Sequence, residues 1–271
     1  MIRVVLVGAA GRMGRAVEAA ATGATDLVVH ARVDQRANFP AGAGVGDGVR
    51  AGGDGVQWSD DVQAVTGKGD VIVDFSGPSG ARAAAAAAAA RGAALVTGST
   101  GLAPDDEAAL RDAAKRVPVL RASNFSLGIA ALRVALRAAL AVLPSTWDVE
   151  IVERHHRLKR DSPSGTALTL AGDVRAARGL PAEALRHGRE GQTGARPARE
   201  IGMHSVRGGT WVGDHEVLFA GEGEWLELRH VAQDRAAFAH GALAAVRFVA
   251  TAAPGWYTLE DVLRGPGPRS A

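Results

Sequence analysis

The sequence predicts an α/β protein whose first domain is a doubly wound parallel sheet and whose second is an α+β domain built on a mixed sheet. Three observations lead to this prediction. Short β-branched runs alternate with alanine-rich stretches in the first part of the chain, a glycine-rich turn follows the first run, and the pattern changes beyond Ala122. We place the first domain at residues 1–126 together with 236–271, and the second at residues 127–235.

Strands and helices are expected to alternate through the first domain, which is the pattern of a parallel sheet. Runs of valine, isoleucine and leucine predict strands at residues 4–7, 27–33, 71–75, 95–96 and 117–120. Alanine-rich stretches predict helices at residues 12–21, 81–91 and 105–115. Alanine has the highest helix propensity, so we interpret the eight consecutive alanines at residues 83–90 as part of a packed helix.

The second domain is expected to begin with an amphipathic helix that ends before Pro144, followed by a strand and by a helix that starts near Thr166. The Arg- and Gly-rich residues 186–199 have no periodicity and predict a mobile loop. Glycine turns, typical of an antiparallel meander, separate three further predicted strands. The expected ranges are helix 127–143, strands 147–153, 201–206, 211–219 and 225–231, and a last helix, 236–251, that packs back on the first domain.

The composition fits a cytoplasmic protein and gives no sign of a nucleic-acid or membrane partner. The 271 residues carry 31 Lys and Arg against 29 Asp and Glu, a net charge of +2, which provides no large positive field for nucleic acid. The chain has no cysteine, which excludes disulfides and thiolate metal sites and fits a reducing compartment. No apolar run has the length of a secretion signal or of a membrane span. We therefore expect neither a membrane nor a nucleic-acid partner.

A glycine-rich turn opens the first predicted helix. Its residues are Gly8, Ala9, Ala10, Gly11, Arg12, Met13 and Gly14. Glycines at such a turn let backbone amides approach a pyrophosphate, and the helix N-terminus adds positive charge. Asp34, at the end of the second predicted strand, is placed to accept hydrogen bonds from ribose hydroxyls. A purely structural turn and a solvated carboxylate are the alternatives.

The sequence leaves both NADH and NADPH open as cofactor. The charge of Asp34 disfavours a 2′-phosphate, whereas Arg12 and Arg36 would attract one. Two further loops follow predicted strands at the edge where parallel sheets bind ligands, and either they contact the nicotinamide half of the cofactor or they are ordinary loops. Their candidate residues are Gly98, Ser99 and Thr100 in one loop, and Ala122, Ser123, Asn124 and Phe125 in the other.

Residues 153–166 are the most informative for chemistry. They hold two imidazoles, His155 and His156, several cations including Lys159, and a predicted helix start. We interpret this density of positive charge as a site for an anion such as a dicarboxylate. Surface histidines and a solvated lysine are the plain alternative, and a metal site lacks further ligands at suitable spacing. The candidate contacts for a carboxylate at the helix start are Ser164, Gly165 and Thr166.

This segment, from Glu153 to Ala167, resembles the signature of the 4-hydroxy-tetrahydrodipicolinate reductase (dihydrodipicolinate reductase) family. The resemblance rests on His155-His156 with Lys159 and on Asp161-Ser162-Pro163-Ser164-Gly165-Thr166-Ala167. Similar motifs recur in order over nearly the whole chain. They are residues 8–14, 73–76, 98–101, 122–126, 189–196, 201–209 and 213–215.

The resemblance implies a Rossmann-like nucleotide-binding first domain and a second domain for substrate binding and tetramerisation. It implies an NAD(P)H-dependent reduction, in lysine and diaminopimelate biosynthesis, of the dihydropyridine-type species formed when the hydroxylated ring loses water. His155 would be the acid/base residue and Lys159 the proton donor, while His156, Gly165 and Thr166 would hold a substrate carboxylate. Residues 8–13, Asp34, 98–100 and 122–125 would line the cofactor.

Two departures from the family pattern concern the cofactor. Gln35 stands where many relatives have an arginine for a 2′-phosphate, and Gly77 replaces a basic residue often found after the third strand. Two other functions fit the same sequence. One is a nicotinamide-dependent oxidoreductase for another small carboxylated substrate, and the other is a dinucleotide-binding protein without catalysis, which has less need of the His155 and Lys159 pair.

Overall fold

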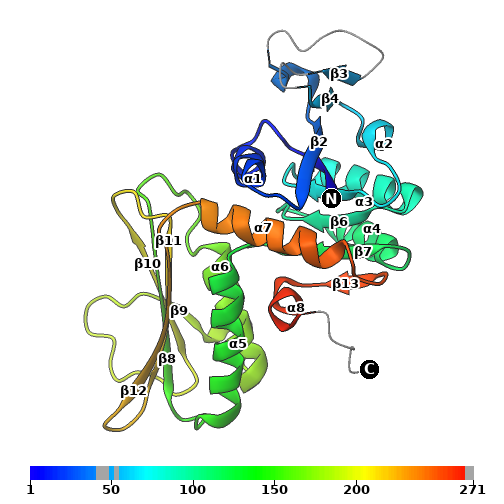
Figure 1. Cartoon of the computed structure of the whole chain (residues 1–271). Helices are drawn as coiled ribbons and strands as arrows, with labels where there is room; N and C mark the ends of the chain where they lie inside the picture. Colours follow the sequence, from blue (N-terminus) through cyan, green and yellow to red (C-terminus); the bar gives the residue numbers. More distant parts are fainter. Residues whose placement is uncertain (41–48, 52–54, 266–271) are drawn as a thin grey trace. The chain divides into compact units, whose positions relative to one another are not determined.

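Figure 1 shows the computed structural model, which describes residues 1–40, 49–51 and 55–265. The chain forms two compact units, one of Met1–Phe125 with Ala236–Ala271 and the other of Ser126–Arg235. Each unit has its own sheet and its own hydrophobic core. None of the helices in the described ranges combines the length and the hydropathy that a membrane span needs.

The first unit is built on an eight-stranded sheet in the order β13-β7-β6-β5-β1-β2-β4-β3. All neighbouring pairs are parallel except β3 with β4. Because β1 pairs with β2 on one side and with β5 on the other, the predicted doubly wound parallel sheet is confirmed. The strands are β1 (Ile2–Val7), β2 (Leu27–Val33), β3 (Val49–Ala51), β4 (Gln57–Ser59), β5 (Val71–Asp74), β6 (Ala94–Thr97), β7 (Pro118–Arg121) and β13 (Gly255–Tyr257).

The polyalanine stretch forms a packed helix, as predicted, although the helix begins earlier, at Pro78, because proline suits the first helical position. The helix ends at Arg91, and Gly92, with a φ of 69°, forms a left-handed cap after it. Its buried alanines allow close packing on the sheet core. The helices of this unit are α1 (Arg12–Thr22), α2 (Val62–Val65), α3 (Pro78–Arg91), α4 (Pro104–Ala114), α7 (Ala236–Val249) and α8 (Leu259–Arg264).

Helix α7 follows the second unit in the sequence but packs in the first. It contacts α1 and the strands β5, β6 and β7, and its buried face is made of small and aliphatic residues. The short elements β3, β4, α2, β13 and α8 were not predicted, because three to six residues are too few to show a hydrophobic period.

The second unit is built on a five-stranded mixed sheet in the order β12-β11-β8-β10-β9, which confirms the predicted sheet type. β10 runs parallel to β8 and β9, whereas β11 runs antiparallel to β8 and β12. The strands are β8 (Asp148–His155), β9 (Leu185–His187), β10 (Ile201–Arg207), β11 (Gly213–Ala220) and β12 (Trp225–Ala232).

The predicted antiparallel meander is only half right. β11 and β12 form a hairpin, but β10 and β11 are not neighbours, because β8 lies between them. The Gly208-Gly209 segment is therefore a crossing and not a hairpin turn. It passes over the end of β8, where the amide of Gly208 donates to the carbonyl of His155 at 3.0 Å and the amide of His156 donates to the carbonyl of Trp211 at 2.8 Å.

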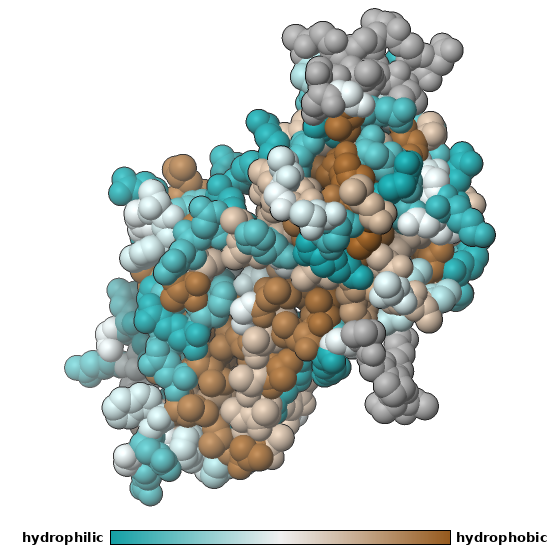
Figure 2. Space-filling model, viewed as in Figure 1, coloured by the Kyte–Doolittle hydropathy of each residue, from teal (hydrophilic) through white to brown (hydrophobic). Residues whose placement is uncertain are grey.

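Helices α5 (Leu127–Val142) and α6 (Gly165–Arg178) cover one face of this sheet (Figure 1). Their buried side meets Val149, Ile151 and Phe219 in the core of the unit. The outward side of α5 is also apolar, with Val134 39% and Val142 81% exposed. Figure 2 shows hydrophobic residues gathered over this helix.

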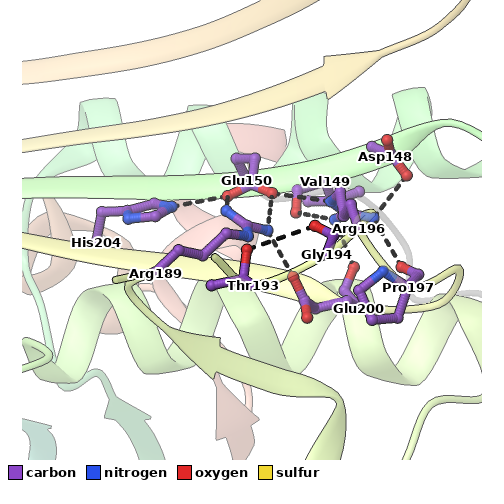
Figure 3. Close-up of polar contacts among 10 residues, drawn as sticks. All are labelled: Asp148, Val149, Glu150, Arg189, Thr193, Gly194, Arg196, Pro197, Glu200 and His204. Carbon is purple, nitrogen blue, oxygen red and sulfur yellow. Dashed lines mark hydrogen bonds and ion pairs between the residues drawn. The ribbon is translucent and has the colours of Figure 1, made fainter. Parts of the chain in front are cut away.

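In the predicted loop at residues 186–199, residues 188–199 have no regular structure, whereas residues 186 and 187 belong to β9. The segment is tied to the face of the sheet that α5 and α6 leave uncovered (Figure 3). Arg189 and Arg196 both donate to Glu150 of β8, and His204 of β10 lies 2.7 Å from the same carboxylate. Burial alone would raise the pKa of Glu150, but the hydrogen bonds from Arg189, His204 and Arg196 lower it to about 2. The segment is therefore anchored by charged contacts, in contrast to the mobile loop that the sequence predicts.

Candidate active site

The glycine-rich turn between β1 and α1 packs closely against neighbouring backbone at two of its glycines. Gly8 has a φ of 78°, in the region that favours glycine, and a Cβ there would lie 2.8 Å from the carbonyl oxygen of Phe75. A Cβ on Gly14 would overlap the carbonyl of Gly8, so α1 packs directly on the turn. Gly11 precedes α1 as its N-cap and has no side chain to cap the helix, which leaves the first amides available to an anion.

Asp34 follows β2 and faces this turn. Its Oδ2 accepts a hydrogen bond from the amide of Ala10 at 2.9 Å, and its Oδ1 accepts from the amide of Gln35 at 2.8 Å and from the side chain of Asn38 at 2.7 Å. These donors orient the carboxylate and leave lone pairs for a ribose diol. Arg36, predicted to attract a 2′-phosphate, is paired with Asp60 instead.

A pocket of about 930 Å³ lies at the carboxyl ends of β1, β2 and β5. This is the edge at which an open parallel sheet binds ligands, and the volume is within the range of ligand sites. Of the predicted cofactor residues, Gly8, Ala10, Gly11 and Asp34 line this pocket, whereas Arg12 is exposed and is not part of the lining. Sequence reasoning gave no cofactor role to several other lining residues, among them Arg15, Asn38, Asp61, Phe75, Ser76, Ser79 and Gly80.

Asp74, at the end of β5, holds the neighbouring loop in place. Its buried carboxylate accepts hydrogen bonds from the hydroxyls of Thr97 at 2.7 Å and Ser99 at 2.8 Å, and from the amide of Ser76 at 3.0 Å. The hydroxyl of Ser99 in turn accepts from the amide of Gly77 at 2.8 Å. The predicted cofactor residue Ser99 is only 4% exposed, and its hydroxyl is bonded to Asp74 and Gly77 of the protein itself.

The remaining predicted cofactor residues differ in exposure. A Cβ on Gly98 would overlap the ring of Phe75, which packs edge-on against Phe125 at 5.2 Å between centroids. Phe125 is thus buried between the two predicted cofactor loops, where it packs against Phe75. Of the other predicted cofactor residues, Ala9 is buried and Met13, Ala122 and Asn124 are half-buried. Thr100 and Ser123 are exposed.

The predicted chemical site lies at the carboxyl end of β8. His155 is 7% exposed, and its Nδ1 lies 2.5 Å from Oε2 of Glu153, which is fully buried. Burial would raise the pKa of Glu153, but hydrogen bonds from His155, Arg207 and Ser205 hold it well below its usual range. The carboxylate therefore stays charged next to the imidazole.

His215 of β11 packs edge-on against His155, with 5.1 Å between ring centroids. Because burial and the neighbouring His155 disfavour a second positive charge, the pKa of His215 is lowered to about 4. Its Nε2 lies 3.1 Å from the hydroxyl of Ser164. Sequence reasoning quoted His215 as part of a motif but gave it no role, since its partner is 51 positions away.

The expected helix start at residues 163–166 is present. Ser164 is the N-cap of α6: its hydroxyl accepts from the amide of Ala167 at 3.2 Å, and its own amide donates to Glu153 at 3.1 Å. Ser164 is 2% exposed, so its side chain caps α6 from a buried position. Gly165 is exposed and Thr166 half-exposed, and both lie in the first turn of α6.

The cations of this segment are more nearly balanced than the sequence suggests. Arg154 pairs with Glu216 at 2.9 Å on the opposite face of the strand, and Lys159 pairs with Asp161 at 2.8 Å. His156 is half-buried at the start of the turn. An anion site here would therefore depend on the α6 N-terminus, Lys159 and the imidazoles, and less on an excess of unpaired charge. Among the residues described, no three His, Cys, Asp or Glu side chains are grouped to hold a metal ion.

The glycine turn with Asp34 in one unit suits a dinucleotide, and the other unit holds a buried histidine, a lysine and a helix N-terminus. With the family models and the named relatives, these features identify the class of protein as an NAD(P)H-dependent oxidoreductase. Family models match the chain over residues 2–125, as the N-terminus of dihydrodipicolinate reductase, and over residues 128–263, as its C-terminus. The chain belongs to the dihydrodipicolinate reductase family.

Individual relatives agree with this assignment. The chain is 45% identical to the 4-hydroxy-tetrahydrodipicolinate reductase of Myxococcus xanthus, covering 97% of this chain and 98% of that protein. It is 43% identical to the enzyme of the same name from Thiobacillus denitrificans, over 97% of this chain and 98% of that protein. A dihydrodipicolinate reductase from Paenisporosarcina sp. TG-14, solved with dipicolinate bound, superposes with a TM-score of 0.76 at 25% identity and covers 95% of this chain and 97% of its own.

Proposed function

We propose that this chain reduces (2S,4S)-4-hydroxy-2,3,4,5-tetrahydrodipicolinate, through dihydrodipicolinate, to tetrahydrodipicolinate in the diaminopimelate route to lysine. The proposal follows the family to which the chain belongs and the relative that is solved with dipicolinate bound. When bound, the nicotinamide supplies a hydride for the conjugated imine. The unit formed by Met1–Phe125 and Ala236–Ala271 would bind the nucleotide, and Ser126–Arg235 would bind the substrate.

In the nucleotide unit, the backbone of residues 8–13 would cradle the pyrophosphate at the start of α1. Asp34 would accept hydrogen bonds from the adenosine ribose, because its carboxylate is already oriented by the amide of Ala10. The loops at residues 98–100 and 122–125 would contact the nicotinamide half of the cofactor. Asp74 would hold the first of these loops in place through its hydrogen bond with Ser99.

In the substrate unit, the amides of Gly165 and Thr166 would hold one ring carboxylate, with His156 beside them. Lys159 would share its ammonium between Asp161 and the substrate, and would donate the proton that the reduced ring takes up. His155 would act as acid/base through Nε2, since Glu153 occupies its Nδ1. Positive groups so placed stabilise the negative charge that develops on the ring as hydride arrives.

The observation that carries the proposal is the position of a buried His155 at the end of β8, in the same unit as Lys159 and the α6 N-terminus. The direct test is NADH and NADPH oxidation, followed by nicotinamide absorbance, with the cyclic imine generated by a coupled synthase. We expect turnover with the imine and none with simple keto or hydroxy acids. Turnover with those acids alone would favour another oxidoreductase, and tight NADH binding without turnover would favour a dinucleotide-binding protein.

We also propose that the chain is a cytoplasmic homotetramer that associates through the face of the second sheet left uncovered by α5 and α6. Val206, Trp225 and Val231 point from this face and are 38%, 71% and 50% exposed. Light scattering should give about four times the 27.8 kDa chain mass. Trp225→Glu should reduce the assembly, because it places a charge in an apolar contact. A monomeric wild-type chain would refute this part of the proposal.

A further inference from the structure

Glu153 and His155 share one face of β8, because side chains two residues apart on a strand point the same way. Glu153 is fully buried, and its Oε2 lies 2.5 Å from Nδ1 of His155. A contact at Nδ1 leaves Nε2 as the nitrogen that can face a ligand.

Arg207 approaches the same carboxylate from the next strand. β10 runs parallel to β8, and the register places Arg207 beside His155 and Ser205 beside Glu153. Both terminal nitrogens of Arg207 donate to Glu153, each at 2.8 Å, one to each oxygen. Such a bidentate pair fixes the plane of the carboxylate as well as its position.

A third element also holds Glu153. The backbone amide of Ser164, the residue before α6, donates to Oε1 at 3.1 Å. The same arginine that binds the carboxylate donates to the carbonyl of Asp161 at 2.8 Å, in the loop that carries Lys159. Glu153 and Arg207 thus connect three parts of the predicted substrate site: His155, the α6 N-terminus and the Lys159 loop.

A glycine lies next to the other nitrogen of His155. Gly213 is the residue of β11 next to it, and a Cβ at that position would lie 3.3 Å from Nε2. That distance is tighter than an ordinary carbon contact, so a side chain would press on the nitrogen.

We propose that Glu153 and Arg207 are positioning residues for His155: the bidentate pair holds the carboxylate that binds Nδ1, fixes the tautomer of the ring and presents Nε2 to the substrate. This inference rests on the proposed function of the site. The simpler alternative is that the pair only joins β8 to β10. A joining role would affect stability, whereas a positioning role affects the rate of the chemical step and its pH dependence.

The test is Glu153→Gln, measured for kcat, for KM of the imine, for NADH affinity and for thermal unfolding. We expect kcat to fall by roughly 10- to 100-fold with NADH affinity within about twofold, since partners that orient a functional histidine have effects of this size. The titratable and charged groups around His155 are Glu153 on its own strand, Arg207 on β10 and His215 on β11. Removing the one negative charge among them disfavours the imidazolium, so the alkaline limb of the kcat/KM profile should move to lower pH.

The matched control is Asp173→Asn in α6. Asp173 also accepts a bidentate pair from an arginine, Arg133 of α5, at 2.7 and 2.9 Å, but this pair joins α6 to α5 and does not involve His155. We expect this variant to lose stability while keeping kcat and the pH profile of the wild type.

Arg207→Lys is the second variant, because it keeps the charge and removes the bidentate geometry. Arg207→Lys should also lower kcat, but by less than Glu153→Gln does. If Glu153→Gln does not fold, Arg207→Lys distinguishes a positioning role from a joining role. Wild-type kcat and pH profile in a folded Glu153→Gln or Arg207→Lys chain would overturn the inference, even while the wild-type enzyme reduces the imine. A wild-type enzyme that does not reduce the imine would instead refute the proposed function.

Discussion

The hydroxyl of Ser164 lies 3.1 Å from Nε2 of His215 while it also caps α6. The same arrangement recurs one strand away, where the hydroxyl of Ser126, the N-cap of α5, lies 3.1 Å from Nε2 of His230. His215 and His230 are register partners on β11 and β12. Two helix N-termini are therefore fixed to adjacent strands by imidazoles, at the end of the sheet that carries His155.

The first prediction concerns the pH dependence of stability. The pKa of His215 is about 4 in the folded chain, below its ordinary 6.5, so between these values the unfolded chain binds a proton that the folded chain does not. Stability should therefore fall as the pH is lowered from about 6.5 to about 4, and should level off below. In His215→Gln, whose amide can still reach Ser164, thermal unfolding measured across this range should lose part of that slope.

His240→Gln is the control, because the imidazole of His240 is exposed. It should keep the wild-type slope. An unchanged slope in His215→Gln would show that His215 does not remain neutral in the folded chain.

The second prediction concerns Asp74. Asp74→Asn keeps the size of the side chain but replaces an acceptor of several hydrogen bonds with a group that must also donate. We expect a loss of about 1–3 kcal/mol in denaturant unfolding, with weaker NADH binding, since buried donors are left unpaired. Asp26→Asn, at an exposed pair with Arg247, should change little. Wild-type stability and NADH affinity in Asp74→Asn would argue against its role in holding the loop.

The third prediction concerns cofactor preference. The carboxylate of Asp34 faces the pocket, and the guanidinium of Arg36 is paired with Asp60, so a 2′-phosphate would meet negative charge. Fluorescence titration should give a lower Kd for NADH than for NADPH. Asp34→Ser should weaken NADH binding and narrow the difference. Equal affinities in the wild-type chain would contradict this account.

The fourth prediction concerns the two proposed proton-transfer residues. His155→Gln and Lys159→Ala should each lower kcat by roughly 10²- to 10⁴-fold, the usual contribution of a positioned acid or base, with NADH affinity preserved. Steady-state assays with the imine measure kcat, and fluorescence titration measures NADH binding. Near-normal turnover in both variants would overturn the role assignment.

Much of the nucleotide unit could be predicted from sequence, because buried parallel strands appear as continuous apolar runs and the turn is marked by glycines at fixed positions. The second sheet was harder. Its order depends on which strand lies beside β8, and a hydrophobic pattern does not encode that pairing.

The same limit explains what was missed at the site. His155, Lys159 and the α6 N-terminus belong to one segment, so sequence reasoning brought them together. Glu153 lies in that segment too, two residues before His155, and the strand period alone could have placed them on one face. Arg207 could not be assigned to Glu153, because the predicted meander put β10 beside β11 and not beside β8. Polar side chains on neighbouring strands can be paired only when the strand order and register are known.

The central claim is that a dicarboxylate binds at the end of β8. A crystal structure of the enzyme with nicotinamide dinucleotide and dipicolinate tests it most directly. The account predicts one carboxylate within hydrogen-bond distance of the amides of Gly165 and Thr166 and of the Lys159 ammonium, with the ring beside Nε2 of His155. Dipicolinate bound elsewhere, with His155 and Lys159 making no contact to it, would contradict the account.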